Sequence, residues 1–201
     1  MDFKAYLPLV IFLFVVTAFN LSAVEKFKQM DALSYYDTAM AYQEKNKLDK
    51  AMANLDRAIE IDPGLTKAWF ARGSVQFKRC EYEKACQDFS KAIQLDPKLI
   101  EAYYNRGMIY DELKKYDLAI KDYTVAIGLD SKYPELWNNR GVAYFCSQQY
   151  EKAAEDYSMA IHLNPGYTSA YKNRALAYLR LGMKEMAVKD YRKYKALIGI
   201  K

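Results

Sequence analysis

The hexapeptide AIEIDP occupies residues 58–63, and related phrases return as AIQLDP at 92–97, AIGLDS at 126–131 and AIHLNP at 160–165. Successive phrases are 34 residues apart each time. A fixed period of this length is the signature of a repeat architecture, in which each repeat is one supersecondary element. With the proline set at position 32, five repeats fill the chain after its N-terminal segment: residues 32–65, 66–99, 100–133, 134–167 and 168–201.

Two sets of positions within the repeat show helical spacing. Positions 4, 8 and 11 carry an aromatic residue, a small residue and, in most repeats, a tyrosine. Position 20 is always alanine, position 24 is large, and position 27 is alanine in four repeats. Residues three or four apart share one helical face, and the residue before a proline is pushed out of the α conformation, which ends the second helix. Each repeat is therefore predicted to be a helix–turn–helix that needs a neighbour to bury its apolar face. Where AIGLDS lacks the proline, Pro134 is expected to open the next helix.

The period, the aromatic and alanine positions and the terminal proline resemble the tetratricopeptide repeat family over residues 32–201. The resemblance implies an all-α fold, a right-handed superhelical solenoid of helix–turn–helix repeats. It also implies that the first helices line a concave groove, which in this family commonly takes an extended or helical peptide from a partner.

Arginine at position 7 and aspartate at position 23 occur together in four repeats, and both are replaced in the first, by Thr38 and Asn54. Joint presence and joint absence predict an ion pair between the two helices of one repeat, because a partly buried Arg–carboxylate fork is a common tie between helices. An anion-binding ladder of arginines is the alternative, and we favour the structural pairs. They are Arg72 with Asp88, Arg106 with Asp122, Arg140 with Asp156, and Arg174 with Asp190.

Asparagine occupies position 6 of three successive repeats, as Asn105, Asn139 and Asn173. By the family resemblance this position faces the groove, and the row is similar to the asparagine ladder of the O-GlcNAc transferase superhelix, which holds a peptide backbone. An amide side chain matches a peptide bond in its donors and acceptors without reading the peptide's side chains. The alternative is three solvated asparagines kept by repeat duplication. Other side chains expected in this peptide-binding groove are Phe70, Phe77, Tyr104, Met108, Asn138, Lys172 and Arg180.

Composition and motifs argue against several other functions. A net charge of +5 is mild for this length, whereas nucleic-acid binding asks for a concentrated basic face. The one histidine and three unpaired cysteines do not make a four-ligand zinc site. We read Cys80, Cys86 and Cys146 as free thiols, with a Cys80–Cys86 disulfide as the alternative in an exported protein. No phosphate-binding loop or catalytic motif is found. The sequence therefore predicts a protein that is not an enzyme, with no nucleic-acid partner, metal or cofactor.

The N-terminal segment predicts a signal peptide or an N-terminal membrane anchor over residues 1–24, followed by a short linker or helix extension over 25–31. The stretch from Ala5 to Val24 is 20 residues long and almost wholly apolar, which is the length of a membrane-spanning helix. Val16-Thr17-Ala18 and Leu21-Ser22-Ala23 also provide the small residues of a signal-peptide cleavage site. Both interpretations stay open at this point. Either one predicts a location at a membrane, periplasm, envelope or lumen rather than in the cytoplasm.

The leading functional hypothesis is a protein- or peptide-binding scaffold or adaptor, membrane-tethered or exported, that captures a partner segment in its groove. The alternative is a structural assembly subunit that acts through the solenoid ends. In the last repeat Tyr194 replaces the alanine of position 27, and no polar capping helix follows. An apolar face left at the C-terminal helix would then serve self-association into a homo-oligomer or incorporation into a larger complex.

Overall fold

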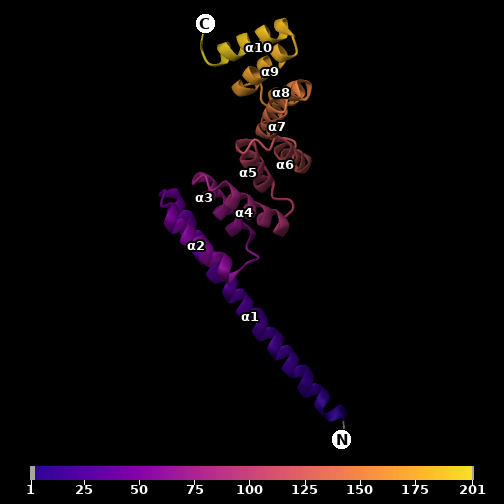
Figure 1. The fold of residues 1–201 in the computed structure, drawn as a ribbon. Coiled ribbons are helices and arrows are strands. Elements are labelled where there is room, and N and C mark those ends of the chain that lie inside the picture. Colours follow the sequence, from indigo (N-terminus) through magenta and orange to yellow (C-terminus); the bar gives the residue numbers. More distant parts are fainter. Residues whose placement is uncertain (1–2, 201) are drawn as a thin grey trace. The chain divides into compact units, whose positions relative to one another are not determined.

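The computed structural model describes the backbone of residues 3–200 and the side chains of residues 23–200. This part of the chain is entirely helical apart from turns, and it divides into two compact units between Arg79 and Cys80 (Figure 1). Unit 1 contains α1 (Phe3–Glu44), α2 (Leu48–Ile61) and α3 (Thr66–Lys78). Unit 2 contains α4 (Tyr82–Leu95), α5 (Ile100–Glu112), α6 (Tyr116–Leu129), α7 (Pro134–Cys146), α8 (Tyr150–Leu163), α9 (Thr168–Arg180) and α10 (Lys184–Leu197).

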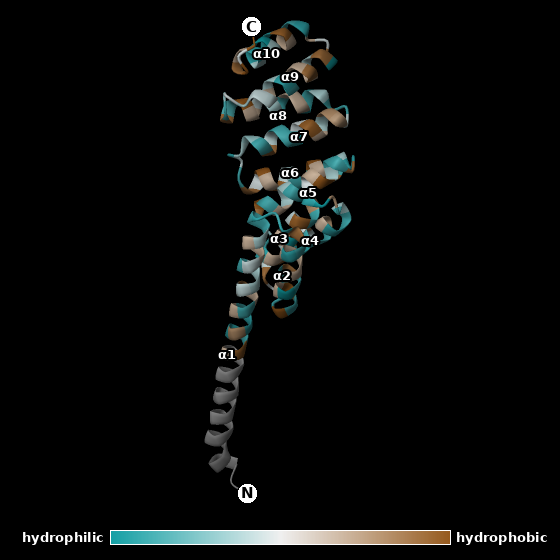
Figure 2. Ribbon diagram, turned by 90° about the vertical axis from the view of Figure 1, so that its left-hand side faces the viewer, coloured by the Kyte–Doolittle hydropathy of each residue, from teal (hydrophilic) through white to brown (hydrophobic). Residues whose placement is uncertain are grey.

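The helices follow the predicted repeats, and the all-α repeat fold is confirmed. The first helix of repeat 1 is the C-terminal part of α1, and each later repeat supplies one first helix and one second helix. Within unit 2 every helix packs on the next one along the chain. Figure 2 shows hydrophilic and hydrophobic stretches alternating along α6, α7 and α8, as expected for helices that bury one face.

The Asp-Pro step ends the second helix as predicted. α2 stops at Ile61, and Asp62 is extended, with φ −132°. Its carboxylate accepts a hydrogen bond from the backbone N–H of Gly64 at 2.9 Å, so a local side-chain turn replaces the helix. Asp96, Asp130 and Asn164 accept the same bond in the next three repeats. Pro134 is the first residue of α7, where its missing N–H has no helical partner to lose.

A left-handed residue closes the first helix of each repeat, and the sequence did not predict it. Position 15 has a positive φ in all five repeats, at Asn46, Cys80, Lys114, Gln148 and Gly182. In repeat 4 the Gln149 N–H reaches back to the Tyr144 carbonyl at 2.8 Å, and the Gln148 N–H bonds to the Phe145 carbonyl at 3.0 Å. This is the Schellman type of helix ending. Only repeat 5 has glycine here, the residue that adopts this conformation without strain.

Large rings packed against glycines form the core of unit 2. The side chains of Tyr123 and Tyr157 are almost completely buried. An added Cβ on Gly107 would lie 2.7 Å from Cε1 of Tyr123, and one on Gly141 would lie 2.7 Å from Cε1 of Tyr157. In these two repeats the tyrosine ring occupies the space that a side chain at position 8 would need.

The predicted signal peptide or membrane anchor at residues 1–24 lies almost wholly outside the residues whose side chains are described. Among the described residues, no helix combines the length and the apolar character that crossing a bilayer requires. Residues 25–31 lie inside α1. Val24, Phe27 and Met30 are exposed there, three residues apart along the helix.

Candidate functional site

Three of the predicted Arg–Asp pairs are two-pronged forks inside unit 2. In repeat 4, Nε of Arg140 donates to Asp156 at 2.7 Å and Nη2 donates to the other carboxylate oxygen at 2.8 Å. Nη1 of Arg140 also donates to Thr124 of the preceding repeat at 3.1 Å. Arg106 binds Asp122 and Ser90, and Arg174 binds Asp190 and Ser158, with the same geometry. Each arginine thus ties its own first helix to two second helices.

The surroundings of these forks mark them as structural. All three carboxylates are buried. The guanidinium of Arg140 also lies over two rings, 5.0 Å from the centre of Trp137 and 5.7 Å from that of Tyr144, a stabilising cation–π arrangement. An arginine with these contacts has little left to offer an anion from solution. Arg72 belongs to unit 1, where it donates to Asp56 at 2.7 Å, and its predicted partner Asp88 belongs to unit 2.

Asparagine amides connect three successive first helices of unit 2. Nδ2 of Asn173 on α9 donates to Oδ1 of Asn138 on α7 at 3.1 Å. Nδ2 of Asn138 donates to Oδ1 of Asn139 at 3.1 Å, and Nδ2 of Asn139 donates to the hydroxyl of Tyr104 on α5 at 3.2 Å. We call this series of hydrogen bonds the asparagine chain. Asn105 follows Tyr104 on α5 and is partly buried, but it is not a member of the asparagine chain.

The asparagine chain differs from the predicted row of three equivalent amides. Asn138, which is 6 % exposed, is the central member and is bonded on both sides. The hydrogen bonds of the chain use one N–H of each amide, and each amide has two. Among the described residues, the chain therefore keeps hydrogen-bonding capacity for a ligand while each member is held in place by its neighbour.

The other predicted groove residues divide between the two units. Met108 is partly buried on α5, and Lys172 and Arg180 are exposed on α9. Phe70 and Phe77 are partly buried on α3 and so belong to unit 1. The residues that the structure brings together into one site are those of α5, α7 and α9.

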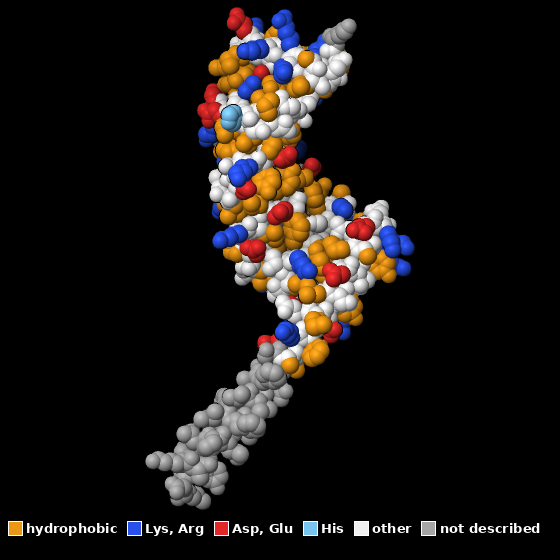
Figure 3. Space-filling model, turned by 180° about the vertical axis from the view of Figure 1, so that it is seen from behind, with side chains coloured by type: hydrophobic (Ala, Val, Ile, Leu, Met, Phe, Trp, Pro, Cys, Tyr) orange, Lys and Arg blue, Asp and Glu red, His pale blue; other side chains and the backbone are white. Residues whose placement is uncertain are grey.

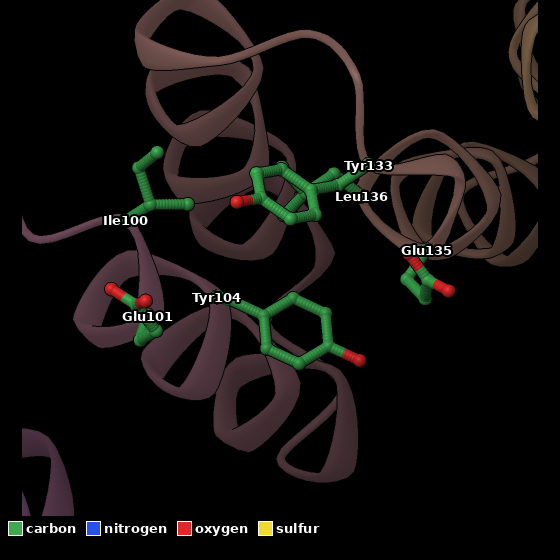
Figure 4. A pocket seen from close by; sticks show the side chains of 6 residues that line it. All are labelled: Ile100, Glu101, Tyr104, Tyr133, Glu135 and Leu136. Carbon is green, nitrogen blue, oxygen red and sulfur yellow. The ribbon is translucent and has the colours of Figure 1, made fainter. Parts of the chain in front are cut away.

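A small pocket beside the asparagine chain was not predicted as a unit. It has a volume of about 180 Å³ and is lined by Ile100, Glu101, Tyr104, Tyr133, Glu135 and Leu136 (Figure 4). Only Tyr104 was expected at the site. The signal that could have found the pocket is the glutamate at position 2 of two successive repeats, with a tyrosine at position 34 between them.

A buried carboxyl lies at the end of α5. The Tyr123 hydroxyl donates to Oδ2 of Asp111 at 2.8 Å, while Oδ1 is buried without a hydrogen-bond partner. Burial raises the pKa of Asp111 to about 6, although the bond from Tyr123 lowers it. The folded protein therefore binds this proton more tightly than the unfolded chain, whose Asp pKa is near 3.8. The stability gained from the raised pKa is complete below about pH 4 and is lost as the pH rises through about 6.

Replacing Asp111 with asparagine is expected to stabilise the protein by about 1 kcal/mol at pH 7.5, because a neutral amide keeps the acceptor for Tyr123 without burying a charge. The gain should disappear near pH 4. Urea unfolding at both pH values measures the difference. Glu112→Gln changes the exposed neighbour and should leave the pH dependence nearly unchanged. An Asp111→Asn variant that is less stable than the parent at pH 7.5 would contradict the expectation.

A metal-binding site is not found among the described residues. No group of three or more His, Cys, Asp or Glu residues among them could hold a metal ion. Cys80, Cys86 and Cys146 are free thiols, and His162 is exposed. On the face shown in Figure 3, charges of both signs are scattered among hydrophobic side chains.

The fold is that of a helical-repeat scaffold, a class of protein that works by binding other proteins. Family models of the tetratricopeptide repeat match residues 32–65, 100–133, 134–167 and 168–197, and a TPR repeat model matches residues 81–114. These matches cover well over half of the chain, and the protein belongs to the tetratricopeptide repeat family. Among curated proteins, none matches the sequence.

Solved structures with the same fold include several tetratricopeptide repeat proteins. A crystal structure of MamA is 25 % identical, with a TM-score of 0.78, over 80 % of this chain and 94 % of that one. MamA from Desulfovibrio magneticus RS-1 is 19 % identical, with a TM-score of 0.79, over 83 % and 94 %. YrrB, described as a TPR protein with an unusual peptide-binding site, is 23 % identical, with a TM-score of 0.76, over 88 % and 91 %. The family and these neighbours support a protein or peptide partner in general.

Proposed function

We propose that this protein is a non-catalytic scaffold that captures a peptide segment of a partner along the first helices of unit 2. The observation that carries the proposal is the asparagine chain, because it sets amides from α7 and α9 and a hydroxyl from α5 side by side across three repeats. Amide side chains can pair with a peptide backbone of any sequence. Exposed Lys172 and partly buried Met108 lie on the same helices and would contact the peptide's side chains. The proposal includes tethering or export through residues 1–24.

The proposal is tested by replacing Asn105, Asn139 and Asn173 with alanine in one triple variant and measuring its affinity for peptides. Peptides selected on the full chain from a random display library are the probes, and fluorescence anisotropy measures their affinity. Each lost hydrogen bond is worth about 0.5–1.5 kcal/mol, so the triple variant should bind the selected peptides at least about tenfold more weakly. Unchanged affinity would overturn the groove proposal.

The triple variant is also expected to be less stable than the parent protein, so a control variant with a similar loss of stability is needed. Asn138 is buried and would lose both of its amide partners, which costs about 1–3 kcal/mol. Gly141→Ala is the matched control, because it also destabilises α7 but leaves every amide in place. It should retain peptide binding at a temperature where both variants are folded.

A second candidate function is assembly through the C-terminal end. Leu176, Leu179, Val188 and Tyr191 of α9 and α10 are exposed and line one hollow together with Lys172, Arg192 and Lys195. Exposed apolar surface of this kind often marks an interaction site. This hollow supports the alternative of self-association or of incorporation into a larger complex.

A further inference from the structure

The pocket between α5 and α7 combines aromatic faces with negative charge. Figure 4 shows the rings of Tyr104 and Tyr133 on opposite sides of the hollow, with Glu101 and Glu135 toward its two ends. Leu136 is buried and Ile100 is partly buried, so the floor is apolar, while both glutamates are exposed. The pocket thus offers two π faces and two carboxylates and carries no positive side chain of its own among its lining residues.

The corresponding place in unit 1 already holds a cation. Nζ of Lys67 lies 4.2 Å from the centre of the Tyr36 ring. Lys67 is position 2 of repeat 2, and Tyr36 is position 5 of repeat 1. The equivalent residues two repeats further along the chain, in unit 2, are Glu135, at position 2 of repeat 4, and Tyr104, at position 5 of repeat 3. Where unit 1 supplies its own ammonium to the tyrosine, unit 2 supplies a carboxylate and leaves the ring face to a cation from outside.

We propose that this pocket binds the charged end of a lysine or arginine side chain of the captured peptide. The inference rests on the proposed peptide-binding function and names one chemical requirement of the peptide. A cation over a tyrosine ring is attracted by the negative face of the ring, and the two carboxylates add charge complementarity. An anionic side chain would meet repulsion from both glutamates.

The size of the pocket supports one side chain rather than a whole small molecule. Pockets for drug-sized ligands and cofactors measure about 300–1,000 Å³, and this one measures about 180 Å³. Its position also fits a peptide held by the asparagine chain, because Tyr104 lines the pocket and accepts the hydrogen bond from Asn139. A peptide lying along the amides would therefore reach the pocket with a neighbouring side chain.

The electrostatics of the nearby hydroxyls agree with negative charge at this place. Burial raises the pKa of Tyr104, the hydrogen bond from Asn139 lowers it, and the charge of Glu135 raises it. Burial also raises the pKa of Tyr167, with Glu135 as the next contribution. Glu135 therefore lies within electrostatic reach of two tyrosine hydroxyls from adjacent repeats, which agrees with negative charge beside this pocket.

The alternative is that Glu101 and Glu135 only stabilise the helices on which they lie and bind no ligand. Glu101 and Glu135 lie in the first turns of α5 and α7, where an acidic residue interacts favourably with the helix dipole. Glu151 occupies the same kind of site at the start of α8 but does not line the pocket. Glu151→Gln is therefore a matched control, since it removes the same dipole interaction and the same charge at another helix.

The experiment uses the full chain with ring-labelled tyrosine and follows the Tyr104 and Tyr133 resonances by NMR. The probes are arginine blocked at both ends, lysine blocked in the same way, and citrulline blocked in the same way as the neutral isostere of arginine. Arginine or lysine should shift both resonances in a saturable manner, and citrulline should not. Glu101→Gln combined with Glu135→Gln should weaken cation binding at least about fivefold, while Glu151→Gln should not change it.

An equal response to citrulline, or unchanged cation binding in the double glutamine variant, would overturn the proposal. A second test variant, Tyr133→Ala, removes one ring from an exposed position and should abolish the response of the Tyr104 resonance without unfolding the chain. The two proposals fail separately. If only the cation pocket is wrong, selected peptides still bind through the amides but carry no required basic residue; if only the groove is wrong, blocked arginine still binds.

Discussion

Replacing Arg140 with alanine is expected to lower the free energy of unfolding by about 3 kcal/mol, because it leaves a buried carboxylate without its partner. Asp156 is only 4 % exposed. Burial raises its pKa, and the fork from Arg140 opposes that rise. Without the arginine, the protein must bury an unpaired charge or take up a proton. For a chain of this size the loss corresponds to a fall in Tm of roughly 6–12 °C, which differential scanning calorimetry measures.

Two comparisons separate the charge from other contributions of Arg140. Adding Asp156→Asn to Arg140→Ala should recover part of the stability, because the unpaired charge is then gone. Arg192→Ala removes an exposed arginine of α10 and should change stability by less than about 0.5 kcal/mol. If Arg140→Ala left the Tm unchanged but weakened binding of an anionic ligand, the anion ladder would replace the structural fork as the interpretation.

The fold and the Arg–Asp forks could be predicted by comparing equivalent positions of the five repeats, because both depend on residues that recur with the 34-residue period. Small and large residues recur at helical spacing, and the second helix ends where the Asp-Pro step forbids its continuation. The Arg–Asp pair could be predicted because repeat 1 lacks both partners, so that positions 7 and 23 of the repeat change together. The structure adds the third partner at position 25, where Ser90, Thr124 and Ser158 accept from the same arginines.

The binding face could be predicted only in part, because its details depend on side-chain geometry that breaks the repeat. Asn138 stands at position 5, where the neighbouring repeats have Tyr104 and Lys172, and it turns a row of amides into a hydrogen-bonded chain. The pocket likewise needs Tyr133 at position 34, where the first two repeats have leucine. The left-handed turn was missed because non-glycine residues such as Lys114 and Gln148 occupy it.

These departures from the repeat gather in one place. Tyr104 takes part in both the asparagine chain and the pocket, and Glu135 reverses the charge that Lys67 has in unit 1. A residue whose role is packing alone should be the same at its position in every repeat, as the alanine of position 20 is in all five repeats. Asn138 and Glu135, which both differ from the residues at the same positions of repeats 1 and 2 and both lie on α7, agree with the proposed recognition of a ligand.

The second large effect is expected for Gly141→Ala, which should lower the free energy of unfolding by about 2 kcal/mol. The new Cβ would lie 2.7 Å from Cε1 and 2.9 Å from Cδ1 of Tyr157, a ring that is 1 % exposed and so has no room to move away. Overpacking of this kind costs about 1–3 kcal/mol, and we take the upper end because ring atoms receive the contact. Alanine offsets about 1 kcal/mol through its higher helix propensity.

The other repeats indicate how the overlap can be relieved. Repeat 1 combines Ala39 with Leu55 at the same two positions, and both are fully buried in one cluster. In repeat 5, Ala175 is combined with Tyr191, whose side chain is 52 % exposed. Adding Tyr157→Leu to Gly141→Ala should therefore restore much of the lost stability, although Tyr157→Leu alone should destabilise the protein by leaving a cavity. Urea unfolding of the three variants measures this coupling, and simple additivity of the two losses would show that ring and Cβ do not compete for the same space.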